Sequence, residues 1–308
     1  MQAKVSCGIS KNVSDNLLDM LVFVQVVQAG SLSAAARELH VSLTVVSRKL
    51  GRLEERLGVR LLNRTTRSLT LTEEGARFYE RCVRILAEVN DAEAEVTNGL
   101  DTAVGLLRVT STFAFGSQLL APLLQEFQDR HPALHVHLDT RDAVTNIVEG
   151  GYDLAVRFGA LADSSLIAKQ LAPNRRVICG APSYLQRHGY PRTIEDLLSH
   201  NVIVFGDPPN NHWTFADGRS ITVSGKLSSN NGELAHRWAL RGAGLILKSI
   251  WDVHDDLRSG QLEQVLPDLK MPAAPIHAVF PHNRLTPAKV RLCIDFLADR
   301  LRSLRFDR

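Results

Sequence analysis

The sequence of 308 residues predicts a multidomain α/β protein built from three successive parts. The first part joins two short helices to a two-stranded hairpin, the second is one long amphipathic helix, and the third alternates strands with helices. Apolar residues at spacings of three and four predict the helices, and short apolar runs between polar turns predict the strands. With 44% hydrophobic residues, the chain can bury two or three separate cores.

The first 14 residues are polar and precede the first periodic helix, which we expect to begin near Asp15. They lack a secretory apolar core, and no apolar run in the chain reaches the roughly 20 residues that a membrane-spanning helix needs. We therefore expect a disordered arm or a start-site artefact over residues 1–14, and a soluble, cytoplasmic protein with no membrane partner.

Residues 30–58 predict a helix-turn-helix. Ser42 is a good N-cap for the second helix, because its hydroxyl can accept an otherwise unpaired backbone N–H. The apolar residues of that helix form one stripe: Val46, Leu50, Leu53 and Leu57. Its opposite face carries hydroxyl and basic residues near the N-terminus: Thr44, Ser47, Arg48 and Arg52. Such a helix suits the major groove of DNA, although a helical hairpin with a basic outer face can also be plain solvated surface.

A basic hairpin is predicted directly after this helix, over residues 59–72. Arg64 and Arg67 at its tip would reach phosphates or the minor groove beside the second helix. Between Ser42 and Thr70 the chain has seven Lys or Arg and two acidic residues, a net charge of +5, whereas the whole chain carries +3. One basic stripe on a nearly neutral chain predicts a single nucleic-acid surface. The candidate DNA contacts are Ser42, Thr44, Ser47, Arg48, Arg52, Arg64 and Arg67.

One long helix is predicted over residues 72–99, with an acidic first turn that complements the helix dipole. Its apolar residues alternate spacings of four and three over about three heptads: Phe78, Cys82, Ile85, Val89, Ala92 and Val96. Such a stripe can pack on the helix's own domain or on a second copy of the chain. No second helix lies nearby in sequence, so we expect self-association that pairs two DNA-reading heads.

The remainder of the chain predicts an open, mostly parallel sheet flanked by helices. Strands are expected over 106–110, 135–138 and 153–157, with helices over 119–130 and 143–149. A second block over 165–266 contains expected strands at 177–179, 201–205 and 244–247 and a helix at 232–242. A final amphipathic helix is expected over 287–304.

This order of parts resembles the LysR-type transcriptional regulators, and in spacing a CrgA-like branch of them, from about Asp15 to Arg302. The resemblance rests on FVQVVQAGSLSAAARELHVS, VSRKLGRLEERLGVRLLNRTTRSLTLTEEG, LLAPLLQEFQDRHPALHVHL, GYDLAVRFG and RGAGLILKS. It implies a winged helix-turn-helix (15–71), a dimerising linker helix (72–99) and a periplasmic-binding-protein-like effector domain (105–304). In that layout lobe I takes 105–164 and 267–304, lobe II takes 165–266, and hinges lie near 166–171 and 265–270.

The resemblance also implies partners. Family members bind double-stranded promoter DNA, respond to a small-molecule effector and assemble as homo-oligomers, usually dimers of dimers. The recognition helix departs from the family pattern, since Leu43, Thr44 and Val45 stand where relatives often have Gln, Pro or Ser, and Ala. Another member's operator therefore does not carry over, whereas Ser47 followed by Arg48 does match.

In this fold, ligands bind in the cleft between the lobes, at strand ends and helix N-termini. The implied effector contacts are Thr110, Ser111, Thr112, Thr140, Arg157, Phe205, Asn230 and Asn231. Arg157 and the free amides at helix starts indicate an anionic metabolite. Each of these residues has an ordinary alternative as a cap or turn, and Arg157 as the ion-pair partner of Asp153. Ala114 stands where relatives often carry a hydroxyl.

Other function classes find less support. The sequence has no Gly-rich phosphate loop, GxSxG elbow or HExxH pair, so we expect no enzyme and no cofactor. His135 and His137 would share a strand face, but no third ligand is evident, and we expect no metal. An exported solute-binding protein would need a signal sequence. An architectural DNA-binding protein that needs no effector is the more serious rival.

The four cysteines, Cys7, Cys82, Cys179 and Cys293, form no CxxC pair and show no metal-ligand spacing. In a cytoplasmic protein we expect them to be reduced, buried, small apolar residues. A redox-sensing pair is the alternative.

Overall fold

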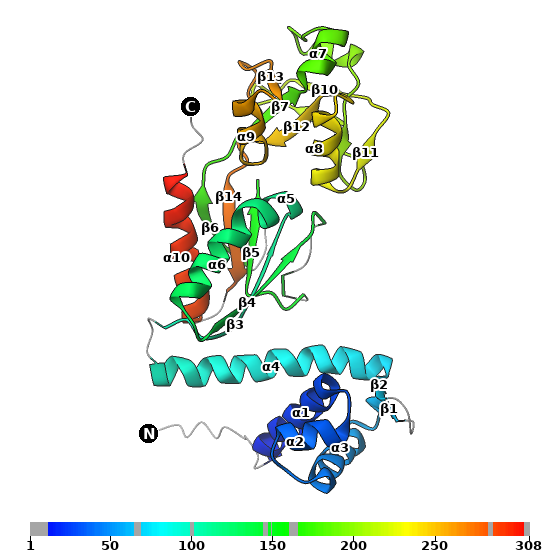
Figure 1. Ribbon diagram of the computed structural model, residues 1–308, viewed down its shortest axis with the longest axis vertical. Helices are drawn as coiled ribbons and strands as arrows, with labels where there is room; N and C mark the ends of the chain where they lie inside the picture. Colours follow the sequence, from blue (N-terminus) through cyan, green and yellow to red (C-terminus); the bar gives the residue numbers. More distant parts are fainter. Residues whose placement is uncertain are drawn as a thin grey trace, which may run out of the picture. The chain divides into compact units, whose positions relative to one another are not determined.

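The computed structural model describes residues 12–64, 69–98, 102–143, 147–148, 150–159, 166–282 and 286–304. The chain divides into two compact units, Met1–Thr97 and Asn98–Arg308 (Figure 1). In the described part of the chain no single helix is long and apolar enough to cross a membrane. The bent pair Asp15–Ala29 and Leu32–Glu38 meets that test only when both helices are taken together.

The N-terminal unit contains the predicted helices and hairpin. Its elements are α1 (Asn12–Ala29), α2 (Leu32–Glu38), α3 (Leu43–Leu57), β1 (Leu62–Arg64), β2 (Leu69–Leu71) and α4 (Glu73–Asn98). Ser31 and Ser42 cap α2 and α3 by accepting hydrogen bonds from the N–H groups of Ala34 and Val45, at 3.1 and 3.3 Å. Gly58 ends α3 in the left-handed conformation, with φ of 69°. Helix α1 starts three residues before the predicted Asp15, and residues 1–11 lie outside the described part.

The core of this unit lies under α3. Val46, Leu50 and Leu53 have no exposed surface, which confirms the apolar stripe. They pack with Phe23 of α1 and Leu61 beside the hairpin. The two strands pair antiparallel, with Leu62 opposite Leu71, while the hairpin tip at 65–68 lies outside the described residues.

The predicted seam of α4 is divided in the structure. Phe78 and Cys82 belong to the core of their own unit, where the Phe78 ring lies 5.8 Å from that of Phe23 and Cys82 is fully buried. The prediction that these two residues face a partner is therefore wrong for the N-terminal turns of the helix. Ile85 and Ala92 are exposed and Val89 is partly buried, whereas the side chain of Val96 lies outside the described set.

The C-terminal unit has two lobes. Lobe I is a five-stranded sheet in the order β4-β3-β5-β14-β6. Its strands are β3 (Gly105–Ser111), β4 (Leu134–Thr140), β5 (Leu154–Phe158), β6 (Leu166–Ala172) and β14 (Ile276–Pro281). Strand β3 is parallel to β4 and β5, but β14 is antiparallel to both of its neighbours, so the sheet is mixed rather than mostly parallel.

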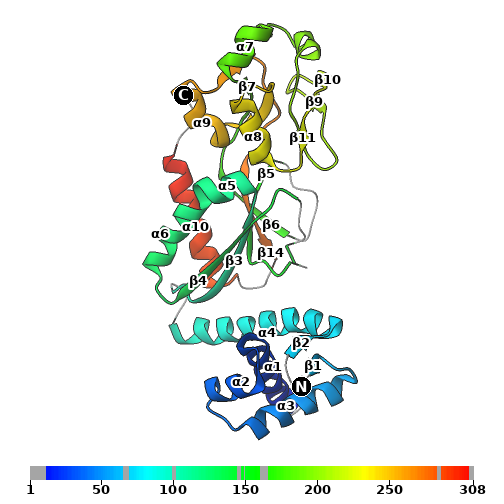
Figure 2. The same ribbon diagram turned by 45° about the vertical axis from the view of Figure 1, so that its right-hand side comes forward.

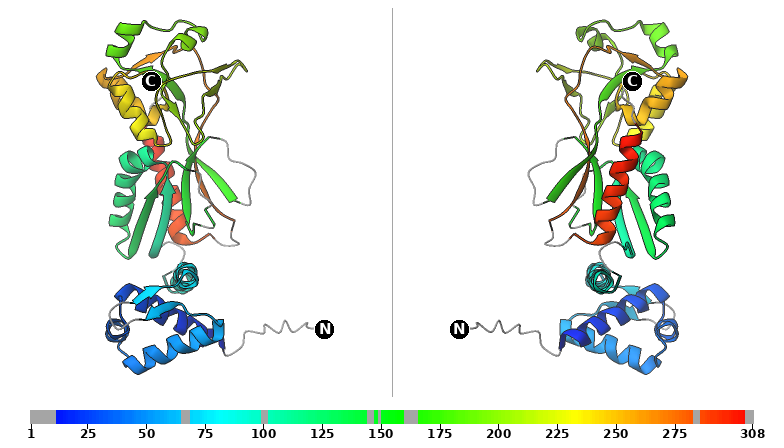
Figure 3. Two further views of the ribbon diagram at one scale, coloured as in Figure 1. Left: turned by 90° about the vertical axis from the view of Figure 1, so that its right-hand side faces the viewer. Right: turned by 90° about the vertical axis from the view of Figure 1, so that its left-hand side faces the viewer.

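Two helices cover one face of this sheet, as Figures 2 and 3 show. They are α6 (Ala121–Arg130) and α10 (Ala288–Ser303), and their apolar residues share a core with Leu107, Val109 and Val156. Helix α6 continues a short helix α5 (Phe113–Phe115) and a π-helical turn (Gly116–Leu120), so helical structure begins before the predicted residue 119. A helix was predicted over 143–149, but residues 143, 147 and 148 form a bend and a turn instead. Residues 144–146 and 149 lie outside the described part.

Lobe II is built on a second, antiparallel sheet in the order β12-β7-β13. Its strands are β7 (Arg176–Gly180), β12 (Ile246–Ser249) and β13 (Glu263–Val265). Its helices are α7 (Pro182–His188), α8 (Gly232–Leu240), α9 (Ile250–Ser259) and a 3₁₀ turn (Glu195–Ser199). Two small strand pairs complete the lobe: β8 (Val204–Phe205) with β11 (Ser228–Ser229), and β9 (His212–Thr214) with β10 (Ser220–Thr222).

The chain passes between the lobes twice, after β6 and before β14. Residues 166–171, expected as a hinge, belong to β6 at the edge of the lobe I sheet. The first crossing is therefore at 173–175. The second lies within 266–275, which overlaps the expected hinge at 265–270.

Leu50→Ala should lower the free energy of unfolding of the N-terminal unit by about 2–5 kcal/mol, because removing a fully buried leucine leaves a cavity. Leu43→Ala, at the exposed start of the same helix, is the matched control and should change it by less than about 0.5 kcal/mol. Circular dichroism during denaturant unfolding follows both units, whereas Trp213, Trp238 and Trp251 report by fluorescence on the C-terminal unit alone. Unchanged unfolding of Leu50→Ala would contradict this packing.

Candidate functional site

A buried carboxylate fixes the orientation of α3. Asp19 of α1 has 1% of its surface exposed and accepts hydrogen bonds from Nε and Nη2 of Arg52, at 2.9 and 2.7 Å. Lys49 Nζ lies 3.4 Å from the same carboxylate. Together with the apolar stripe, these contacts prevent α3 from rotating about its axis, so its N-terminal face stays turned outward.

The predicted DNA contacts on α3 fall into two groups. Thr44 and Arg48 are exposed, and neither makes a side-chain hydrogen bond or ion pair with a residue that the structure describes. Ser47 is partly buried beside them, and the Ser42 hydroxyl is used as the helix cap. Arg52 differs, because its guanidinium is turned toward α1, and hydrogen bonding to Asp19 raises its pKa. We therefore assign Arg52 to positioning the helix rather than to contacting DNA.

The hairpin is attached to α3 by a contact that the sequence analysis missed. The Glu54 carboxylate accepts hydrogen bonds from the backbone N–H groups of Leu61 and Leu62, at 2.9 and 3.3 Å. In the sequence, Glu54 entered only the net charge between Ser42 and Thr70, as one of the two acidic residues there. The side chain of Arg64 and all of Arg67 lie outside the described residues.

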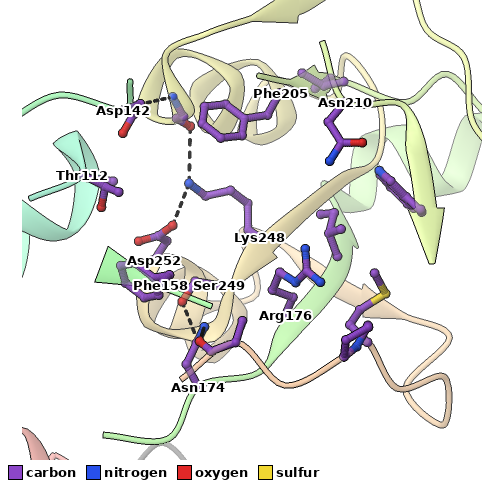
Figure 4. Close-up of a pocket in the computed structure, with 18 of the residues that line it drawn as sticks. Thr112, Asp142, Phe158, Asn174, Arg176, Phe205, Asn210, Lys248, Ser249 and Asp252 are labelled. Atoms are coloured by element: carbon purple, nitrogen blue, oxygen red, sulfur yellow. Dashed lines mark hydrogen bonds and ion pairs between the residues drawn. The ribbon is translucent and has the colours of Figure 1, made fainter. Parts of the chain in front are cut away.

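A cavity of about 410 Å³ lies between the two lobes of the C-terminal unit (Figure 4). Lobe I contributes Thr112, Ala114, Asp142 and Phe158. The crossings contribute Asn174, Met271, Pro272 and Ala274. Lobe II contributes Arg176, Ile203, Phe205, Asn210, His212, Trp213, Thr214, Gly232, Leu247, Lys248, Ser249 and Asp252. This mixture of apolar walls and a few polar groups is typical of a small-molecule site.

The carboxylate of Asp142 joins the two lobes at the cavity wall. It accepts a hydrogen bond of 2.9 Å from the N–H of Phe113, which begins α5 in lobe I. It accepts another, of 2.7 Å, from the N–H of Gly232, which begins α8 in lobe II. A second link between the lobes runs from Gln118 Nε2 to Glu233 Oε2 at 3.2 Å. Asp142 therefore already occupies the first backbone donor that an anion would use at the start of α8, and Asn231 accepts from the next two.

The two cations of the cavity differ in their surroundings. Lys248 is buried and forms an ion pair of 2.7 Å with Asp252, and its Nζ also lies 3.4 Å from the carbonyl oxygen of Gly232. Arg176 is partly buried, and no described residue accepts a hydrogen bond from its guanidinium. Burial lowers the pKa of Arg176, and no neighbouring carboxylate offsets this.

Asn174 connects both crossings to lobe II. Its Nδ2 donates to the carbonyl oxygen of Ala274 at 2.8 Å, and its Oδ1 accepts from the hydroxyl of Ser249 at 2.7 Å. Ser249 is in turn the N-cap of α9 and accepts from the N–H of Trp251. One amide side chain therefore fixes the two crossings at the base of the cavity.

Of the predicted effector contacts, only Thr112 and Phe205 line this cavity. Thr110 is fully buried and its hydroxyl accepts from Arg157 Nη2 at 3.2 Å. Arg157 points to the opposite face of the sheet from its neighbour Phe158, because successive strand residues alternate, and burial lowers its pKa. The prediction that Arg157 holds the effector in this cavity therefore lacks support.

The remaining predicted contacts have structural roles or lie elsewhere. Ser111 is fully buried, and Thr140 packs against Gly116. Asn231 caps α8 by accepting from the N–H groups of Glu233 and Leu234, both at 2.9 Å, which is the ordinary alternative. Asn230 is exposed.

The residues that the sequence analysis missed are the charged and amide groups of the cavity: Asp142, Asn174, Arg176, Lys248 and Asp252. One signal was available, since Lys248 interrupts the apolar run GLILKS and Asp252 follows it by four residues. His135 and His137 are exposed, and the described residues hold no cluster of three or more His, Cys, Asp or Glu suited to a metal ion.

Three of the four cysteines are buried free thiols, as predicted, and Cys7 lies outside the described residues. Burial raises the pKa of Cys82 and of Cys179 to about 12, and raises that of Cys293 as well. Reactive, redox-sensing thiols have a lowered pKa and are accessible, so none of these three fits that alternative.

Comparison with known proteins gives a family for each of the two units. Residues 17–76 match the family described as bacterial regulatory helix-turn-helix protein, lysR family, and residues 101–302 match the LysR substrate binding domain. The HTH-type transcriptional regulator DmlR of Escherichia coli (strain K12) is 40% identical over 286 residues, which cover 91% of this chain and 93% of that protein. The structure of CrgA, a LysR-type transcriptional regulator from Neisseria meningitidis, has 36% identity to this chain and a TM-score of 0.61, and the match covers 92% of this chain and 98% of that one.

The buried thiols should react slowly in the native protein. At pH 8 a thiol with a pKa of about 12 is ionised in roughly one molecule in 10⁴, and only the thiolate attacks a disulfide reagent. In a Cys7→Ser variant, we expect almost no release of thionitrobenzoate from Ellman's reagent before unfolding and complete reaction of all three thiols in denaturant. Fast reaction of one native thiol would show that its burial is not as described.

Proposed function

Because the chain belongs to the LysR family of bacterial transcriptional regulators, we propose that it binds promoter DNA as a homo-oligomer and responds to a small anionic metabolite. The chain is a DNA-binding regulator and not an enzyme. Its relatives are likewise named transcriptional regulators and activators. We place its action in the cytoplasm.

The observation that carries the DNA-binding proposal is the outward face at the start of α3. Thr44 and Arg48 are exposed there, on a helix whose opposite side is buried and whose orientation is fixed by Asp19. In helix-turn-helix proteins the N-terminal residues of the second helix contact base edges. We propose Arg48 as a base contact, and Thr44 and Ser47 as neighbouring contacts to bases or phosphates.

For the oligomer, we propose that the C-terminal part of α4 pairs with the same segment of another copy. Ile85 is 37% exposed, and Val89 and Ala92 continue its stripe beyond the part that packs on α1. Exposed apolar residues at heptad spacing favour a coiled-coil contact. Two such dimers would place their heads on two neighbouring half-sites.

For regulation, we propose that the effector binds in the cavity between the lobes. Its walls come from both lobes and from both crossings, so a ligand that touches both lobes stabilises one arrangement of them over another. In an oligomer, a change in lobe arrangement would alter the spacing of the heads and the bending of the bound DNA.

The test of DNA reading is footprinting on the DNA upstream of the protein's own gene, at physiological salt with excess nonspecific DNA. We expect a protected region with dyad symmetry. Arg48→Ala should weaken specific binding by more than ~1 kcal/mol, the scale of one good base contact. Arg56→Ala, an exposed arginine in the last turn of the same helix, is the matched control and should retain specificity.

Equal losses in Arg48→Ala and Arg56→Ala would remove Arg48 from the reading face. Protection no better than background at this site and in a genome-wide occupancy map would favour an architectural role without an operator.

Ile85→Glu should convert the oligomer to smaller species, because it places a charge in the proposed apolar seam. Asn90→Glu introduces the same charge at an exposed position on another side of α4 and should leave the assembly intact. Light scattering after size exclusion measures the molecular mass of each. An unchanged mass for Ile85→Glu would argue that α4 does not form the contact between copies.

A further inference from the structure

Four charged side chains line the cavity between the lobes, and three of them already have partners. Lys248 is paired with Asp252 at 2.7 Å, and the Asp142 carboxylate accepts two backbone hydrogen bonds. Arg176 is the fourth, and it makes no hydrogen bond or ion pair with any residue in the described part of the chain. Its Nε is buried, so water does not fully replace the missing partner.

An unpaired guanidinium in a cavity reduces stability, because burial removes part of its hydration without supplying an anion. A planar carboxylate would remove that cost, since it can accept two parallel hydrogen bonds from one arginine. Arg176 is the first residue of β7, and Figure 4 shows its side chain close to that of Lys248 among the residues that line the cavity. The geometry therefore makes Arg176 the group that an anionic ligand would meet.

The charge balance favours one negative charge over two. The formal charges of Arg176 and Lys248 are matched by those of Asp142 and Asp252, so the described lining is neutral overall. A singly charged carboxylate beside Arg176 leaves the cavity with one negative charge, whereas a phosphate dianion would leave two near Asp142 and Asp252. Phe158, Phe205, Leu247 and Met271 supply apolar contacts for the remainder of the ligand.

We propose that the effector is a monocarboxylate with an apolar body and that Arg176 binds its carboxylate. This inference rests on the proposed regulatory function and deepens it. It assigns the ligand charge to Arg176 rather than to Arg157, Lys248 or the start of α8.

The first test uses benzoate and hexanoate as probes with the full-length protein, and benzamide, hexanamide and phenyl phosphate as comparison compounds, all at millimolar concentration. Isothermal titration calorimetry should detect binding of the two carboxylates and at least about tenfold weaker binding of the amides and the phosphate. Arg176→Met should weaken carboxylate binding by about tenfold or more. Arg175→Met, the exposed neighbouring arginine, should bind as the wild type does.

A second measurement separates ligand binding from a structural role. If Arg176 serves to bind a ligand and not to stabilise the fold, Arg176→Met without ligand should have a Tm equal to or above that of the wild type. Footprints of Arg176→Met without carboxylate should match those of the wild type, so failure of the DNA-binding proposal is seen separately from failure of this one.

Three results would overturn the inference. They are binding of neither carboxylate, equal binding of the carboxylates and their amides, and wild-type carboxylate affinity in Arg176→Met. A Tm of unliganded Arg176→Met well below that of the wild type would likewise assign Arg176 a structural role.

Discussion

The C-terminal unit depends on one carboxylate, that of Asp142, which holds a helix start from each lobe. Its two acceptor contacts, to Phe113 and Gly232, lie at the wall of the cavity rather than in a core. Removing the contact to the buried Gly232 would leave a backbone donor without its partner, which costs about 1–3 kcal/mol, whereas the contact to Phe113 is exposed and water can replace it. Asp142 therefore contributes both to the arrangement of the lobes and to the wall of the cavity, so a ligand that disturbs this contact also acts on the lobes.

Asp19 plays the corresponding part in the N-terminal unit. Asp19 lies on α1 and binds donors of α3, whereas Asp142 lies in the bend after β4 and binds donors of α5 and α8, so the donors differ. Asp142 binds backbone N–H groups, whose direction is set by the helices, whereas Asp19 binds the side chains of Arg52 and Lys49. Two cations of α3 are thereby directed toward α1, whereas Arg48 remains exposed on the outward side of the helix.

Local patterns predicted the N-terminal unit well, because caps and apolar spacing act within one helix: the Ser42 cap and the apolar stripe of α3 were both visible in the sequence. Heptad spacing could not distinguish a helix packed on its own domain from one packed on a partner, so Phe78 and Cys82 were misassigned. The cavity was least predictable. Antiparallel pairing of β7 with β12 brings Arg176 opposite Ser249, next to Lys248, and no spacing along the chain records that register. Arg157 lies one residue before the end of β5 rather than at its end, and a position near a strand end does not reveal which face a side chain takes.

The contacts around the cavity form a connected set that relates a ligand near Arg176 to the lobes. Gly232 donates to Asp142 of lobe I, and its carbonyl lies beside Lys248, which pairs with Asp252 of α9. Ser249, opposite Arg176 in the sheet, caps α9 and donates to Asn174, which binds the second crossing at Ala274. A ligand shifts the equilibrium between two lobe arrangements only by the difference between its binding free energies for them. Phe158 belongs to lobe I and Arg176 to lobe II. A ligand that touches both residues therefore makes different contacts, and binds with a different free energy, in each arrangement of the lobes.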